Sequence, residues 1–336
     1  MEPSETLPRR RARPHARPAR CRPVLRAALA VAAMGAVTAG GTVCVRARAH
    51  SDAGAVSSAA SPAASSSAPA REEGTVVPVS EPPAVDRKAV LRQAVRSVRV
   101  PSGAQVSAAV LDLDSGAGAV SGDTAFDTAS IVKVDILAAL LLQAQDAGRR
   151  LTAAERSYAA KMIENSDNAS ATALWHTIGR SAGLDAANAR FGLRGTSGGQ
   201  GELWGLTQTT AADQLTLLRQ VFGEKERSGG KGRKAWRPEL SAASRKYVRA
   251  LMASVEPDQR WGVSAAATGG SPALKNGWLP RSTTGLWVVN SIGRVPVDGG
   301  AYLVAVLSRG TSSQAEGVAL VEATAKAAVS GFTSGS

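Results

Sequence analysis

Hydrophobic and polar residues change their period along the chain, and these changes mark separate secondary-structure elements. Residues 105–113 (QVSAAVLDL) are rich in apolar and β-branched residues and end at an Asp-Ser-Gly turn sequence. This pattern predicts a strand, paired as a hairpin with a second strand over 117–121. From Ser130 the apolar positions become nearly continuous (SIVKVDILAALLLQAQDAG), which predicts a long buried helix that ends near Gly148.

The middle of the domain has a helical pattern, and β-structure returns in its last third. Thr152 and Glu155 form a T-x-x-E capping box, which predicts a helix through about Glu164. Further helices are predicted near 169–178, 181–190, 210–222 and 241–254, strands at 273–275, 286–292 and 302–307, and a last helix over 313–328. This order predicts an α+β fold: an antiparallel sheet flanked by terminal helices, with an all-helical insertion between its halves.

The first residues of the chain have a different character. Residues 1–26 form a basic arm rich in Arg and Pro, and residues 27–45 (AALAVAAMGAVTAGGTVCV) carry no charge. Such a segment spans about 28 Å as a helix, close to the hydrocarbon thickness of a bilayer. It is predicted to be a signal peptide or a signal anchor, which places the bulk of the chain outside the cytoplasm, either secreted or anchored to the membrane.

A linker and one domain make up the rest of the chain. Residues 51–85 consist mainly of Ala, Ser, Pro and Gly and cannot bury enough apolar surface to order themselves, so they are predicted to be a disordered linker. The following domain is predicted over 86–333. With 44% hydrophobic and 20% charged residues, the 336-residue chain can supply it with a sizeable core.

Charge and residue counts exclude several kinds of function. The net charge is +13, but residues 1–50 hold ten Arg against two Glu, so the domain itself is only weakly basic and nucleic-acid binding is not expected. Both Cys and all His except His176 also lie within residues 1–50, which excludes a disulfide framework, a Cys-based zinc site and a multi-His metal site in the domain. His176 is interpreted as a packing residue. We expect a monomer without metal or organic cofactor.

Ser130 and Lys133 form an S-x-x-K motif at the start of the most apolar helix. A separation of three places both side chains on one helix face. A buried Lys has a lowered pKa and can act as a base near neutral pH, and a serine hydroxyl needs such a neighbour to become a nucleophile. Alone, the motif also admits a simpler interpretation, in which Ser130 caps the helix and Lys133 extends its amine to the surface.

Two more short motifs follow in order. The tripeptide SDN, residues 166–168, lies between two predicted helices, where turn and cap residues are ordinary. The tripeptide KNG, residues 275–277, lies on a predicted strand, and a glycine inside a strand often marks the close approach of a ligand or another backbone.

Together, S-x-x-K, S-D-N and K-x-G form the motif set of class A β-lactamases and penicillin-binding proteins. The chain resembles the class A β-lactamase-like serine hydrolase family over about residues 100–330. The resemblance implies that Ser130 is the acylated nucleophile, that Lys133 is its activating base or base partner, and that Ser166 relays a proton to the leaving nitrogen.

The resemblance also implies substrate-binding roles. Asn168 would hydrogen-bond the amide side chain of the substrate, and Lys275 would supply positive potential for the substrate carboxylate and the proton relay. Asn276 and Gly277 complete the strand motif. The backbone N–H of Trp278 would form the oxyanion hole together with that of the nucleophile.

The chain departs from the family pattern at three points. Asn276 stands where Thr or Ser is usual, which removes a hydroxyl that commonly meets the substrate carboxylate. Only 36 residues separate Ser130 from Ser166, fewer than is typical. The E-x-x-L-N pattern of the deacylating glutamate is missing, and the only acid in the corresponding stretch 192–208 is Glu202, interpreted either as that base or as an exposed loop residue.

These observations predict an exported serine hydrolase that forms an acyl-enzyme on Ser130 with a β-lactam or a peptidoglycan-type amide. Because a deacylating base is not evident, the acyl-enzyme is expected to persist. The alternative is a penicillin-binding or non-catalytic cell-wall ligand-binding protein with weak or no turnover.

Overall fold

The computed structural model describes residues 85–224 and 236–334. The predicted basic arm, the apolar segment 27–45 and the linker 51–85 up to residue 84 therefore lie outside the described residues. Within the described ranges, none of the helices has both the length and the apolar character needed to cross a bilayer.

A five-stranded antiparallel sheet forms the centre of the described part, in the order β2-β1-β7-β6-β5. Its strands are β1 Gln105–Asp112, β2 Gly118–Ser121, β5 Ala273–Pro280, β6 Trp287–Val297 and β7 Gly300–Thr311. Two short strands, β3 Phe126–Asp127 and β4 Gln208–Thr209, pair separately. The sheet thus joins the first and the last parts of the domain, and β5 is an edge strand.

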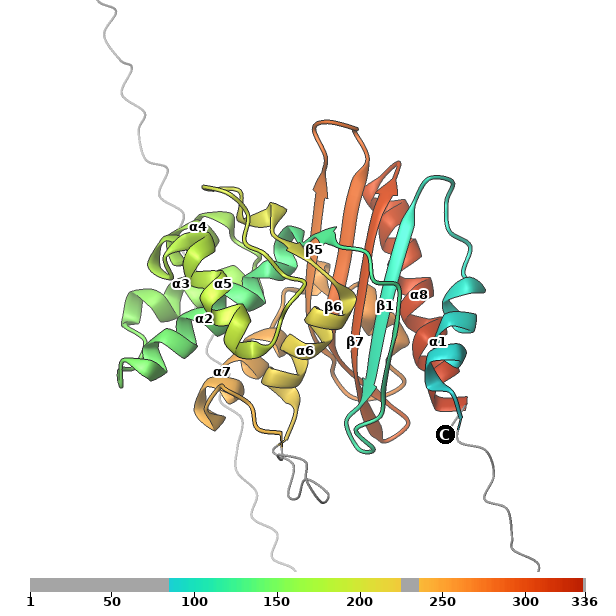
Figure 1. The fold of residues 1–336 in the computed structure, drawn as a ribbon, viewed down its shortest axis with the longest axis horizontal. Helices are drawn as coiled ribbons and strands as arrows, with labels where there is room; N and C mark the ends of the chain where they lie inside the picture. Colours follow the sequence, from blue (N-terminus) through green and yellow to red (C-terminus); the bar gives the residue numbers. More distant parts are fainter. Residues whose placement is uncertain (1–84, 225–235, 335–336) are drawn as a thin grey trace, which may run out of the picture. The chain divides into compact units, whose positions relative to one another are not determined.

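Helices cover both faces of the sheet (Figure 1). On one side lie α1 Arg87–Arg96 and α8 Gln314–Ser334. On the other side lie α2 Val132–Asp146, α3 Ala153–Glu164, α4 Asn168–Thr177, α5 Arg180–Phe191, α6 Ala211–Phe222 and α7 Ala242–Ala253. The predicted α+β class, with terminal helices and a helical insertion, is confirmed.

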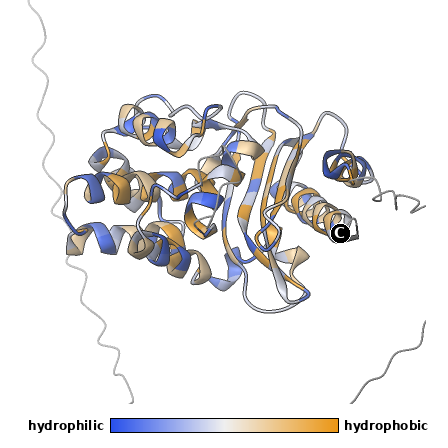
Figure 2. Cartoon of the chain, turned by 60° about the horizontal axis from the view of Figure 1, so that its bottom comes forward, coloured by the Kyte–Doolittle hydropathy of each residue, from blue (hydrophilic) through white to orange (hydrophobic). Residues whose placement is uncertain are grey.

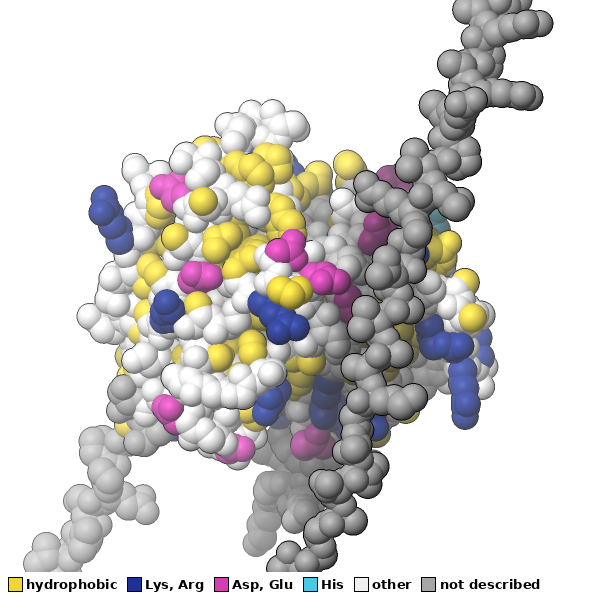
Figure 3. All heavy atoms as spheres, turned by 180° about the vertical axis from the view of Figure 1, so that it is seen from behind, with side chains coloured by type: hydrophobic (Ala, Val, Ile, Leu, Met, Phe, Trp, Pro, Cys, Tyr) yellow, Lys and Arg dark blue, Asp and Glu magenta, His cyan; other side chains and the backbone are white. Residues whose placement is uncertain are grey.

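Alternation along the strands creates two hydrophobic cores, one on each face of the sheet. In β7, Leu303 and Ala305 belong to the core shared with the helical insertion, whereas Val304 and Val306 belong to the core under α1 and α8. A central strand buried on both faces is apolar at successive positions, because neighbouring side chains point to opposite sides. Figure 2 shows hydrophobic colour on the sheet and on the inner sides of the helices that cover it. On the face in Figure 3, by contrast, basic and acidic side chains are interspersed.

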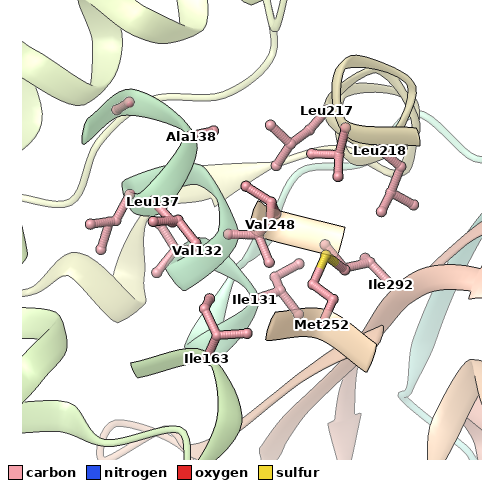
Figure 4. Close-up of a cluster of buried hydrophobic side chains, with 14 of the residues drawn as sticks. Ile131, Val132, Leu137, Ala138, Ile163, Leu217, Leu218, Val248, Met252 and Ile292 are labelled. Carbon is pink, nitrogen blue, oxygen red and sulfur yellow. The ribbon is translucent and has the colours of Figure 1, made fainter. Parts of the chain in front are cut away.

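The helix α2 lies at the centre of the helical insertion and is buried almost all round. Val132 and Leu137 of α2 lie in one cluster with Val248 and Met252 of α7 (Figure 4). Each such side chain contributes about 1.5–3 kcal/mol by leaving water. This packing is what holds the polar residues near the start of α2 inside the protein.

The predicted boundaries hold within two residues for α2 to α7, whereas α8 runs six residues beyond its predicted end and the strands near the C-terminus are longer than predicted. The capping box is present, with Thr152 Oγ1 accepting from Glu155 N at 3.1 Å and Glu155 Oε2 accepting from Thr152 N at 2.7 Å. The last three strands extend beyond their apolar centres, because the hydrogen-bonded ladder continues through polar residues such as Asn276 and Arg294. The bounds of α1 were not predicted, since in this polar helix only Leu91 and Val95 are buried.

Candidate active site

Ser130 lies in a single 3₁₀ turn, Ala129–Ile131, directly before α2. The preceding residue, Ala129, has φ of 48°, a left-handed conformation that is uncommon outside glycine. A residue held this way costs about 1–3 kcal/mol and persists only when its surroundings enforce it. The turn before Ser130 is therefore strained, and other contacts must hold it in place.

Asn290, on β6, holds this turn in place through hydrogen bonds to the backbone. Its fully buried side chain donates to the carbonyl oxygens of Asp127 and Thr128, both at 2.9 Å, and accepts from Ser308 N at 3.0 Å. Thr128 N also donates to Thr207 O at 2.8 Å. Every hydrogen-bonding group of the Asn290 amide faces the backbone, so the sheet positions the residues just ahead of Ser130.

Gly277 brings the edge strand β5 against the same turn. A Cβ atom built on Gly277 would lie 2.6 Å from Ser130 N and 2.7 Å from Ile131 N, closer than real Cβ contacts. No side chain fits at this position, which agrees with the close approach predicted for the strand glycine. The unpaired edge of β5 thus faces the Ser130 turn.

Gly277→Ala is expected to force β5 away from Ser130. Overpacking at such a contact costs about 1–3 kcal/mol of stability, and a displacement of ~1 Å at a reacting group lowers rates by about 10²-fold. Thermal unfolding and the rate of Ser130 acylation by a labelled penicillin measure the two effects. Gly269→Ala is the matched control, because a Cβ there meets nothing within 4 Å. Equal acylation rates for both variants would contradict the assignment of this contact.

Lys133 is the buried amine predicted from the S-x-x-K motif. Its side chain is fully buried. Its Nζ donates to Ser166 O at 2.7 Å, to Asn168 Oδ1 at 2.8 Å and to Ser166 Oγ at 3.1 Å. Burial lowers the pKa of Lys133 to about 7, and the nearby Asp167 carboxylate partly opposes this shift. A lysine with this pKa exchanges its proton near neutral pH.

Lys275, on β5, also donates a hydrogen bond to the Ser166 hydroxyl. Its Nζ donates to Ser166 Oγ and to Asn276 O, both at 3.0 Å. Burial lowers the pKa of Lys275 well below its usual value, and the charge of Lys133 lowers it further. The Ser166 hydroxyl therefore lies between two amines that both have a reduced affinity for protons.

Ser166 is held in a left-handed conformation, with φ of 55°, in the turn between α3 and α4. Asp167 caps α4 by accepting from Ser170 N at 2.7 Å, and Asp167 N donates to Lys161 O. These bonds, with those from the two lysines, fix the turn. The structure thus brings Ser166, Asn168, Lys133 and Lys275 together, and Gly277 places Ser130 beside the strand that carries Lys275.

Asn276 and Trp278 flank this glycine but face different surroundings. Asn276 is buried, and its Nδ2 donates to Gln259 O at 2.8 Å and Trp261 O at 2.9 Å. The Asn276 amide is thus engaged with the backbone next to β5. Trp278 is half-buried, and its ring meets Trp261 edge to face at 5.7 Å between centroids. Both tryptophans add apolar surface at this end of β5.

Glu202 pairs on the surface with His176 and Arg180. Its carboxylate lies 2.6 Å from His176 Nε2 and 3.1 Å from Arg180 Nε, and its side chain is 53% exposed. The hydrogen bond with His176 is the main cause of the lowered pKa of Glu202. None of Ser130, Lys133 and Ser166 is among its partners. His176 is also exposed, so its interpretation as a packing residue is wrong: it pairs with an acid on the surface.

Trp204 and Asn290 are the two residues of this site that the sequence analysis missed. The Lys133 ammonium lies 5.0 Å from the centroid of the Trp204 ring, and Trp204 Nε1 donates to Thr172 Oγ1 at 3.1 Å. The ring belongs to the stretch in which the family pattern would place a deacylating glutamate. It approaches Lys133 as an aromatic face, which attracts a cation but cannot accept a proton from water. Nothing in the local sequence signals this contact, because it joins residues 71 positions apart.

The described residues do not contain a group of three His, Cys, Asp or Glu that could hold a metal ion. The candidate reacting groups are the hydroxyls of Ser130 and Ser166 and the amines of Lys133 and Lys275. Ser130 supplies an oxygen at the start of a helix, and Ser166 supplies a second hydroxyl hydrogen-bonded to Lys133 and Lys275. Such an arrangement suits acyl transfer, in which one hydroxyl attacks a carbonyl and another passes a proton.

Comparisons with known proteins bear on the fold of the chain and on the family that it resembles. A model of the beta-lactamase enzyme family matches residues 89–157, which include Ser130 and Lys133. No curated protein matches the chain. Among solved structures, PBP-A has a TM-score of 0.60 and 21% identity, covering 75% of this chain and 99% of that chain. A variant of PBP-A, an acyl-enzyme complex with penicillin G, has a TM-score of 0.59 and 22% identity, covering 73% and 97%.

A β-lactamase from Burkholderia phymatum is similar as well, with a TM-score of 0.60 and 16% identity, covering 74% of this chain and all of that chain. The described domain therefore has the β-lactamase/transpeptidase fold. The resemblance to the β-lactamase-like serine hydrolases, inferred from three short motifs, is confirmed.

Proposed function

We propose that this protein is an exported serine hydrolase that forms an acyl-enzyme on Ser130 with a β-lactam or a peptidoglycan-type amide. The observation that carries the proposal is the Ser166 hydroxyl held between the amines of Lys133 and Lys275, with Gly277 placing the strand of Lys275 against the turn that contains Ser130. The acyl-enzyme with penicillin G described for the PBP-A variant supports the choice of substrate class. Export rests on the charge and hydropathy of residues 1–45.

Acylation begins with proton removal from Ser130. Lys133 in its neutral form accepts the Ser130 proton, and the Oγ atom attacks the carbonyl carbon of the amide. The backbone N–H groups of Ser130 and Trp278 stabilise the negative charge that develops on the carbonyl oxygen. Ser166 donates its proton to the leaving nitrogen, the C–N bond breaks, and Lys133 returns a proton to Ser166. One covalent bond to Ser130 replaces the amide bond, and protons balance.

Release of the acyl group is the slow step. Water must attack the ester on Ser130, and an efficient hydrolase needs a base for that water. Trp204 presents an aromatic ring to Lys133, and the carboxylate of Glu202 is bound to His176 and Arg180. These contacts also favour the second candidate, a penicillin-binding protein with weak or no turnover.

Intact-mass measurement, combined with nitrocefin hydrolysis, tests the proposal. Incubation of the full chain with benzylpenicillin is expected to add one equivalent of the intact antibiotic, and the adduct is expected to persist while nitrocefin is consumed slowly. Rapid nitrocefin hydrolysis without an accumulating adduct would show an efficient β-lactamase instead. Absence of both an adduct and hydrolysis, in a protein shown by thermal melting to be folded, would refute the proposal.

A further inference from the structure

A cavity of about 520 Å³ lies where the end of α2 meets the beginnings of α3 and α7. Sites that bind small organic molecules usually have volumes of roughly 300–1,000 Å³. The apolar part of its wall consists of Leu141 and Ala144 from α2, Leu151 from the turn before α3, and Tyr247 from α7. This cavity is open to solvent on one side and can accommodate an apolar body against its wall.

Three arginines, Arg149, Arg150 and Arg156, also line this cavity. Arg149 donates two hydrogen bonds of 2.9 Å to the Glu155 carboxylate, and Arg156 donates one N–H to Leu151 O. The guanidinium of Arg150 makes neither a hydrogen bond nor an ion pair within the described part of the chain. A guanidinium has five N–H donors and no acceptor, so these unused donors favour an anion.

The hydroxyl of Ser244 adds a neutral donor. Ser241 Oγ accepts from Ser244 N at 3.1 Å and donates to Ser244 Oγ at 3.0 Å. The proton of Ser244 is then left without an acceptor among the described residues. No Asp or Glu lines the cavity, so the lining carries positive charge and spare donors.

From this combination we infer that the cavity binds an organic monoanion, a carboxylate or sulfonate attached to an aromatic or short aliphatic body. The apolar wall takes the body, and Arg150 together with Arg156 and the Ser244 hydroxyl takes the anionic group. An organic cation would meet only like charge. A neutral apolar compound would leave the guanidinium of Arg150 without a partner.

The cavity is separate from the candidate active site. The helix α2 follows Ser130 and reaches the cavity only from Leu141 onward, about 14 Å along the helix axis from Val132. The α3 helix begins at the cavity and ends two residues before Ser166. A ligand in the cavity therefore touches neither reacting hydroxyl, and the inference does not rest on the proposed function.

Fluorescence titration of the full chain with 8-anilinonaphthalene-1-sulfonate tests the inference, because this probe combines an apolar aromatic body with one sulfonate. Arg150→Gln is expected to weaken binding about tenfold, as loss of a charged hydrogen bond does. Ala144→Trp is expected to abolish binding by filling the cavity. Arg92→Gln, an exposed arginine on α1, is the matched control and should bind like the unaltered protein.

Binding to Arg150→Gln with unchanged affinity would overturn the inference, as would equal affinity for the uncharged analogue 1-anilinonaphthalene. Arg150 is exposed, so its replacement leaves the fold intact and the test stays decisive even where Ala144→Trp unfolds. A crystal structure with the probe against Tyr247 and Arg150 would support it directly. A probe located beside Ser130 would contradict it.

Discussion

Ser130→Ala is expected to abolish the penicillin adduct, with the acylation rate falling by about 10³-fold or more. The Oγ atom is the proposed nucleophile, and removing the nucleophile of a serine hydrolase leaves only residual catalysis from binding and the oxyanion hole. The fold should be unaffected, because the turn is held by Asn290 and Gly277 through backbone atoms and not through the Ser130 side chain. Intact mass after incubation with benzylpenicillin measures the effect.

Ser102→Ala is the matched control, since Ser102 is an exposed serine in the loop before β1. It should form the adduct at the rate of the unaltered protein. An adduct that survives in Ser130→Ala would place the acylated residue elsewhere, and peptide mapping would identify it.

Ser166→Ala distinguishes the roles of the two hydroxyls. Acylation should slow because proton transfer to the leaving nitrogen is lost, while the adduct remains on Ser130.

Much of the fold could be predicted because the informative patterns are local. The strand ending at an Asp-Ser-Gly turn, the apolar helix after Ser130 and the capping box at Thr152 each follow from residues a few positions apart. Strand ends were less accurate, because the ladder that extends β6 and β7 depends on a partner strand and not on the apolar pattern of either one. The order of strands and helices then constrained the fold class.

The site was only partly predictable, for the same physical reason. Three motifs identified Ser166 and both lysines, which meet through side chains that the motifs name. Asn290 and Trp204 act through contacts between distant parts of the chain. A buried Asn in an apolar strand is a usable signal, since its amide needs partners, but the sequence does not say that the partners precede Ser130.

The contacts of Asn276 and Glu202 illustrate the limit of motif matching. Asn276 occupies the middle of the strand motif, yet its amide hydrogen-bonds Gln259 and Trp261. Glu202 is the only acid in its stretch, yet it pairs with His176 and Arg180. A position in a motif indicates where a residue lies along the chain, whereas its function depends on which groups compete for its hydrogen bonds.

Lys133→Met is expected to lower the acylation rate by about 10²- to 10⁴-fold, the usual contribution of a positioned base. The unaltered protein should acylate faster as the pH rises through about 7, because Lys133 must lose its proton to act as the base and burial lowers its pKa to about 7. The variant should lose this dependence along with the rate. Lys246→Met, an exposed lysine on α7, should keep both.

The same pKa makes a prediction about stability that does not depend on activity. Lys133 loses its proton at about pH 7 in the folded protein and at about 10.5 in the unfolded chain. Between these values the unfolded chain binds more protons, so the free energy of unfolding rises with pH, by at most about 1.4 kcal/mol per pH unit from this group. Denaturant titrations at pH 7 and 9 should therefore show a smaller gain for Lys133→Met than for Lys246→Met. Equal gains would mean that Lys133 keeps its proton in the folded protein, and another group would then have to be the base.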